Sequence, residues 1–282
     1  MTSRTLIKNL AALPDGPVSV AGWVETVRDQ KKVQFVILRD ETAAVQLVNP
    51  AVRELDPEGV SVGAAEALAL TEQIHLVRHG EVFNPQGVLY GRLPGYGLSD
   101  LGRQMAQAAA DDLAARKRPV GLLISSPLQR TQQSAEPIAE VFELEAQLDE
   151  RVIEPENRFE GLKMHGRDSA LRDVRNWTFL ANPWEPSWGE PFRSITRRML
   201  NAMHDAWDAN DSGDVVIVSH QLPIWMVHRR VAGKSLAHDP RRRRCALSSI
   251  TSFELRGRRF VEVGYRDPAA GLAAQATDVG AV

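Results

Sequence analysis

The chain has 282 residues, of which 43% are hydrophobic and 25% are charged, and its net charge at pH 7 is −2. These values indicate one or two globular domains and exclude a strong overall attraction to nucleic acid or membranes. The single cysteine, Cys245, excludes an intramolecular disulfide. With neither a leader-like nor a membrane-spanning apolar run, we expect a cytoplasmic protein. The basic run 241–244 is interpreted as a solvated loop.

Short alternations of apolar residues, separated by turns, fill the first 50 residues. The alternating runs at 18–24, 33–38 and 44–48 predict three strands of a small antiparallel β unit over residues 1–50. Residues 51–71 follow Asn49-Pro50 and contain Asp56-Pro57-Glu58-Gly59, which is typical of a linker.

From residue 72 onward, predicted strands alternate with predicted helices. Apolar runs at 74–77, 121–124 and 215–218 predict buried strands, and a hairpin over 250–255 and 260–265 ends the domain. Helices are expected from the N-cap Ser99, over 128–142, over 192–207 and through Trp225. Residues 72–268 therefore predict an α/β domain whose mostly parallel sheet is flanked by helices on both faces. Residues 269–282 are expected to form a flexible tail.

Reactive side chains follow three of the predicted strands. Arg78-His79-Gly80 follows the first, Ser125-Ser126-Pro127-Leu128-Gln129-Arg130 the second, and Ser219-His220 the third. Ligands of parallel sheets bind at the carboxyl ends of the strands, so these side chains should converge on one site. Arginine binds a phosphate dianion through its planar fork, and a neutral, oriented imidazole is a competent nucleophile.

Four motifs carry a resemblance to a known family: Leu-Val-Arg-His-Gly-Glu (76–81), Gly-Arg-Leu-Pro-Gly-Tyr-Gly-Leu-Ser-Asp-Leu-Gly (91–102), Ser-Ser-Pro-Leu-Gln-Arg-Thr (125–131) and Val-Ser-His (218–220). With them, residues 74–267 resemble the histidine phosphatase superfamily, the branch of cofactor-dependent phosphoglycerate mutases and broad-specificity phosphatases. The resemblance implies that His79 accepts the phosphoryl group and that Arg78, Arg130 and His220 complete its pocket. It also implies that neither a metal ion nor another cofactor is needed.

Protonation of the leaving oxygen requires a general acid. The family places it in a segment that matches residues 152–161, where Glu154 fits best and Glu160 and Glu156 are alternatives. Beside a cationic pocket, this carboxyl group would keep its proton only through burial or through the incoming phosphate dianion.

Four residues are candidates for substrate binding: Gly80, Asn84, Arg92 and Gln221. Gly80 would let the backbone approach the anion, Asn84 would donate a hydrogen bond, and Arg92 would contact the rest of the substrate, unless it is a solvated loop residue. The mutase-type Trp segment is absent, and Gln221 stands where a glycine is common. We therefore expect hydrolysis of a small phosphorylated metabolite, with phosphoglycerate mutase-type transfer as the alternative.

Residues 4–49 resemble the start of a bacterial aspartyl-tRNA synthetase, through Val20-Ala21-Gly22-Trp23-Val24 and the runs 34–40 and 45–48. In that family this segment begins an anticodon-binding OB-fold, and Arg28, Phe35 and Gln46 occupy base-contacting positions. An OB barrel has five strands, but only about three fit here. An RNA-binding module with a silent phosphatase fold is therefore the second hypothesis, with tRNA a less favoured partner. A partial barrel leaves an open sheet edge that could pair with a second copy of the chain, so a homodimer is possible.

Overall fold

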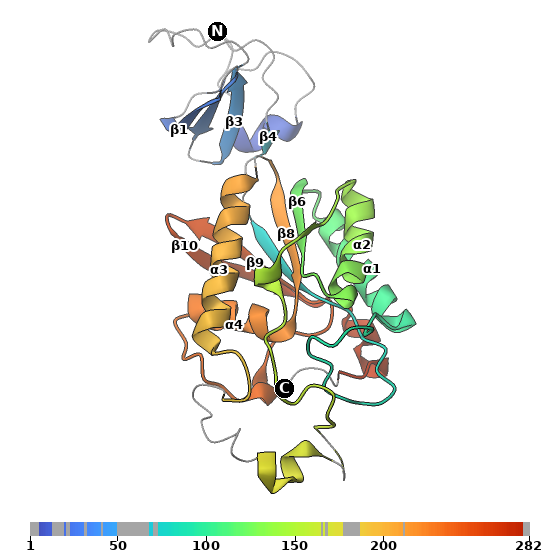
Figure 1. The fold of residues 1–282 in the computed structure, drawn as a ribbon. Coiled ribbons are helices and arrows are strands. Elements are labelled where there is room, and N and C mark those ends of the chain that lie inside the picture. Colours follow the sequence, from blue (N-terminus) through green and yellow to red (C-terminus); the bar gives the residue numbers. More distant parts are fainter. Residues whose placement is uncertain are drawn as a thin grey trace. The chain divides into compact units, whose positions relative to one another are not determined.

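In the computed structural model, the described residues are 6–12, 20, 23–30, 33–40, 42–49, 68–69, 73–164, 166, 169–176, 187–210 and 212–278 (Figure 1). The chain divides into two compact units, Met1–Thr71 with Asp211–Gly213, and Glu72–Asn210 with Asp214–Val282. Among the described helices, none has the length and apolar character needed to cross a membrane.

The described part of the first unit contains an antiparallel sheet in the order β1-β2-β3-β4. Its strands are β1 (Trp23–Gln30), β2 (Val33–Arg39), β3 (Ala44–Asn49) and β4 (Leu68–Ala69), preceded by a 3-10 turn over Ile7–Ala12. The predicted strands at 33–38 and 44–48 are confirmed, whereas the first begins only at Trp23; residues 18, 19, 21 and 22 lie outside the described residues. Leu68–Ala69 falls in the predicted linker but pairs with Val45 and Gln46.

The second unit is built on a sheet whose described strands have the order β10-β9-β5-β8-β6-β7. Four of them run parallel: β5 (Ile74–Arg78), β8 (Asp214–Ser219), β6 (Val120–Ser125) and β7 (Gln147–Leu148). The hairpin of β9 (Ile250–Arg256) and β10 (Arg259–Arg266) adds antiparallel strands beside β5. The predicted mostly parallel α/β fold is confirmed.

Helices cover both faces of this sheet (Figure 1). Successive residues of a strand point to opposite faces. Accordingly, Val215 and Ile217 pack with α3 (Phe192–Ala209) and α4 (Gln221–Val231), whereas Val216 and Val218 pack with α1 (Asp100–Ala115) and α2 (Gln129–Phe142). Burial on both faces explains why the β8 sequence is a continuous apolar run.

The C-terminal segment differs from our expectation of a flexible tail. Ala269 is buried, and a 3-10 turn over Ala270–Gln275 is followed by Ala276, which packs with Met105 and Leu247. The Thr277 amide then donates to Glu81 Oε1 at 2.6 Å. Small residues carry no periodic pattern, so the sequence gives no sign that residues 269–278 dock; residues 279–282 lie outside the described chain.

Candidate active site

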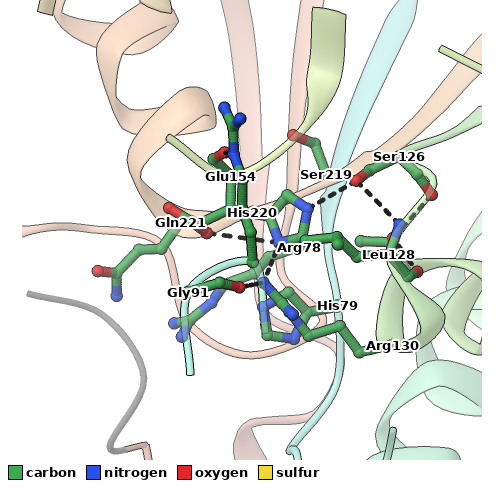
Figure 2. A network of polar contacts seen from close by, with 12 residues as sticks. Arg78, His79, Gly91, Ser126, Leu128, Arg130, Glu154, Ser219, His220 and Gln221 are labelled. Atoms are coloured by element: carbon green, nitrogen blue, oxygen red, sulfur yellow. Dashed lines mark hydrogen bonds and ion pairs between the residues drawn. The ribbon is translucent and has the colours of Figure 1, made fainter. Parts of the chain in front are cut away.

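The carboxyl ends of β5, β8 and β6 meet at one edge of the sheet. Arg78 on β5 pairs with Ser219 on β8, and Ser125 on β6 pairs with Val218. The residues that follow these strand ends therefore come together, as predicted (Figure 2). The rings of His79 and His220 lie 5.2 Å apart in an edge-to-face arrangement.

His79 is oriented by a hydrogen bond to its own neighbour. Its Nδ1 lies 2.7 Å from the Gly80 carbonyl oxygen. A carbonyl only accepts, so Nδ1 carries the proton and Nε2 keeps its lone pair. Burial lowers the pKa of His79 well below its usual range, and the charges of Arg130 and Arg78 lower it further. The imidazole is therefore neutral, which is the form that a nucleophile needs.

Two buried arginines flank the histidines, and each is 1% exposed. Arg78 Nη1 donates to the Cys245 carbonyl at 2.7 Å, whereas Arg130 Nη2 donates to the Gly91 carbonyl at 2.8 Å. The Nε atoms of both arginines are buried without a partner among the described residues. An unpaired buried donor costs about 1–3 kcal/mol. Such donors indicate a site that an anion would complete.

His220 links the second arginine to a serine that our sequence analysis did not select. Its Nδ1 lies 3.3 Å from Arg130 Nη2, and its Nε2 lies 2.8 Å from Ser126 Oγ. Because arginine only donates, His220 Nδ1 accepts this hydrogen bond. The proton therefore sits on Nε2, which donates a hydrogen bond to Ser126 Oγ. Burial lowers the pKa of His220 well below its usual range, and Arg130 adds to this effect.

The segment that carries Glu154 is anchored to the sheet by side chains. Ser219 Oγ, at the end of β8, donates to the Val152 carbonyl at 2.7 Å. Arg92 Nε donates to the carbonyl of Glu154 itself at 2.6 Å. These two hydrogen bonds tie the segment to the end of β8 and to the loop that carries Arg92.

Of the three candidate acids, Glu154 alone contacts one of the two candidate histidines, with its Oε2 3.4 Å from His220 Nδ1. Burial raises the pKa of Glu154, although the charges of Arg130 and Arg243 oppose this. Glu160 Oε1 instead accepts from the Arg92 amide at 3.1 Å, and Glu156 is 77% exposed. The structure thus places Glu154, rather than Glu160 or Glu156, beside His220.

Packing by itself requires a glycine at position 80, and the expected approach of the Gly80 backbone to an anion stays a prediction. A Cβ atom at Gly80 would lie 2.3 Å from the Gly102 carbonyl oxygen in α1. Its amide also already donates to Ser134 Oγ at 3.1 Å. The amide group of Asn84 bridges the backbone of Val88 at 2.8 and 3.3 Å and so closes its own loop, and a hydrogen bond from Asn84 to a substrate stays a prediction.

Arg92 and Gln221 both lie next to the site, and each is held by protein groups. Arg92 is 29% exposed and forms an ion pair with Glu156 at 3.1 Å, which leaves its contact with a substrate a prediction. Gln221 Nε2 donates to the Cys245 carbonyl at 3.4 Å, the same oxygen that Arg78 contacts.

The basic run 241–244 is not uniformly a solvated loop. Arg241 and Arg242 are exposed and pair with Asp239, and Arg244 pairs with Glu262. Arg243 instead turns inward, and its Nη1 donates to Gln221 Oε1 at 3.2 Å. Four successive arginines carry no periodicity, so the sequence could not show which of them faces the site.

In the first unit, two of the three predicted RNA-binding positions are opposite one another in the backbone register, and the third lies on the next strand. Arg28 pairs with Phe35, and Gln46 pairs with Ile37. Gln46 is 6% exposed, while the side chains of Arg28 and Phe35 lie outside the described part. Their binding to RNA stays a prediction.

Residues 74–268, more than half of the chain, match the sequence model of the histidine phosphatase superfamily (branch 1). The chain belongs to this superfamily. The predicted resemblance is thus confirmed, and so is the expectation of a phosphomonoesterase-type enzyme. Residues 18–65 of this histidine phosphatase match the OB-fold nucleic acid binding domain, which confirms the OB-fold resemblance of the first unit.

The histidine phosphatase is 50% identical over 198 residues to an uncharacterised protein of Mycobacterium tuberculosis, a match that covers 70% of this chain and 97% of that protein. Phosphoserine phosphatase 1 of Hydrogenobacter thermophilus is 29% identical over 165 residues, 57% of this chain and 77% of that protein. Among solved structures, a mycobacterial glucosyl-3-phosphoglycerate phosphatase is similar with a TM-score of 0.54 and 25% identity, covering 69% of this chain and 96% of that one.

Proposed function

We propose that this histidine phosphatase hydrolyses a small phosphate monoester through a phosphohistidine at His79, without a metal ion. The observation that carries the proposal is the neutral, oriented imidazole of His79 beside two buried arginines with unpartnered Nε atoms. The similarity to phosphatases that act on phosphorylated metabolites supports the same reaction class.

Substrate binding would complete the hydrogen bonding of the site. The phosphate oxygens accept from the Nε groups of Arg78 and Arg130, in charge-assisted hydrogen bonds. These arginines neutralise the equatorial oxygens, and positioning together with such neutralisation is most of what phosphoryl transfer requires.

Chemistry then proceeds in two displacements at phosphorus. In the first, His79 Nε2 forms a bond to phosphorus, the ester P–O bond breaks, and Glu154 gives its proton to the leaving oxygen. In the second, water attacks the phosphohistidine, Glu154 takes a proton from that water, and the P–N bond breaks to release phosphate. The raised pKa of Glu154 suits the first role, because it favours the protonated carboxyl group that the leaving oxygen needs.

Other predictions gain no support from the described contacts. The mutase-type reaction, RNA binding by the first unit, a homodimer and a cytoplasmic location all stay predictions.

The proposal is tested by release of phosphate from 4-nitrophenyl phosphate in the presence of EDTA. We expect the wild type to be active and His79→Ala to lose activity by at least about 1,000-fold. His204→Ala is a matched control, because His204 lies in α3 against Phe260 and outside the site. Full activity of His79→Ala, or activity that EDTA abolishes and a metal ion restores, would contradict the proposal.

A further inference from the structure

Arg243 lies beside the phosphate site although it belongs to the loop that follows α4. Its Nη1 donates to Gln221 Oε1 at 3.2 Å, and Gln221 Nε2 donates to the Cys245 carbonyl at 3.4 Å. The same carbonyl accepts from Arg78 Nη1 at 2.7 Å. The Gln221 amide group and the Cys245 carbonyl therefore link Arg243 to Arg78 of the phosphate site.

Arg243 is oriented by neutral acceptors. Its Nε donates to His238 Nε2 at 2.9 Å, and the His238 Nδ1 lies 2.8 Å from the Leu236 carbonyl. His238 is neutral because burial lowers its pKa to about 4. A guanidinium has five N–H donors, and two are used in this way. The other three, on Nη1 and Nη2, have no partner in the described part of the chain and form an oriented fork.

The charge of Arg243 is not balanced by an ion pair with any described carboxylate, whereas Arg241, Arg242 and Arg244 in the same loop each have one. Burial lowers the pKa of Arg243 to about 10, and the charge of Glu154 only partly opposes this. Arg243 is partly buried, and cations withdrawn from water are normally paired. A cation that lacks its partner beside a substrate site indicates that the substrate supplies the partner.

We propose that Arg243, held in place by Gln221, binds a carboxylate of the substrate, so that the substrate is a phosphate monoester of a carboxylic acid. This inference rests on the proposed phosphatase function. A planar carboxylate matches the Nη1–Nη2 edge of a guanidinium, which binds it with two hydrogen bonds. Glu154 and Asp278 both act electrostatically on Arg243. A second phosphate dianion would be repelled by the Asp278 carboxylate more strongly than a carboxylate monoanion would be.

The test compares 3-phosphoglycerate with glycerol 3-phosphate, which differ by a carboxylate in place of a hydroxymethyl group. We expect the wild type to prefer the carboxylate ester in kcat/KM by about 10-fold or more. Arg243→Gln should lower this ratio by about 10-fold, and Arg243→Lys, which keeps the charge without the fork, should lower it less. Arg242→Gln is the control, because Arg242 is 87% exposed and pairs with Asp239; it should leave the ratio unchanged.

A wild type without preference for the carboxylate ester, or an Arg243→Gln ratio equal to that of the wild type, would overturn the inference. If Arg243→Gln does not fold, an unchanged ratio in Arg243→Lys has the same meaning. Failure of the phosphatase function is a separate result, seen as no phosphate release from either ester or from 4-nitrophenyl phosphate. In that case, the affinities of the two esters for the wild type and Arg243→Lys, measured by calorimetry, test whether Arg243 binds the carboxylate. A preference for the carboxylate ester that is weaker in the variant supports this role, and equal binding of both esters overturns it.

Discussion

Asp278 binds the guanidinium of Arg78 with both carboxylate oxygens, at 2.6 Å from Nη2 and 2.8 Å from Nη1. Arg78 is 1% exposed and Asp278 is 37% exposed. A carboxylate of the C-terminal segment therefore forms an ion pair with a buried guanidinium at the end of β5. The pair raises the pKa of Arg78, although burial opposes it. It also puts a negative charge next to the place where we expect a phosphate dianion.

Replacing Asp278 should therefore strengthen phosphate binding. In Asp278→Asn, we expect the inhibition constant of inorganic phosphate against 4-nitrophenyl phosphate to fall several-fold, on the order of 1 kcal/mol. Asp208→Asn makes the same charge change on the exposed side of α3 and should leave the constant unchanged. A weaker inhibition in Asp278→Asn would show instead that the carboxylate serves mainly to orient Arg78.

Glu154→Gln should affect substrates according to their leaving groups. An alkyl ester needs its leaving oxygen protonated, so kcat for glycerol 3-phosphate should fall by about 10²–10⁴. The weakly basic leaving group of 4-nitrophenyl phosphate needs less help, and its kcat should fall much less. Glu160→Gln removes the charge but keeps the oxygen that accepts from the Arg92 amide, so it should change both substrates alike. The reverse pattern would make Glu160 the acid.

The low pKa of His79 predicts how the site responds to pH. A lowered pKa means that the neutral imidazole persists to lower pH than in an ordinary histidine, which titrates near about 6.5. Imidazole ¹⁵N shifts of histidine-labelled protein, assigned with His79→Ala, should therefore show no midpoint for His79 near that pH. A midpoint between about 6 and 7 would contradict the burial and the cationic surroundings that the structure gives it.

Much of the catalytic site could be predicted because it follows directly from strand ends. Apolar runs mark β5, β6 and β8, and parallel strands bring the residues after them to one edge of the sheet. Arg78, His79 and His220 therefore lie where the sequence places them. Ser126 lies at the same edge but was read only as part of a helix start.

Contacts between distant loops could not be predicted. Arg243 faces the site through Gln221 and His238, and neither contact leaves a periodic signal in the sequence. Asp278 reaches Arg78 only because the segment before it docks on Met105. The need for glycine at position 80 could not be predicted either. The Gly102 carbonyl that a Cβ atom there would strike comes from another element of the fold.

In the proposed mechanism, His79 carries the phosphoryl group during turnover. The wild type is mixed with a ³²P-labelled phosphate ester, quenched in alkali and digested, and the labelled peptide is identified. We expect base-stable, acid-labile label on the peptide that contains His79, and none in His79→Ala. Label on another residue, or turnover by the wild type at full rate with no labelled protein at any time point, would contradict the account.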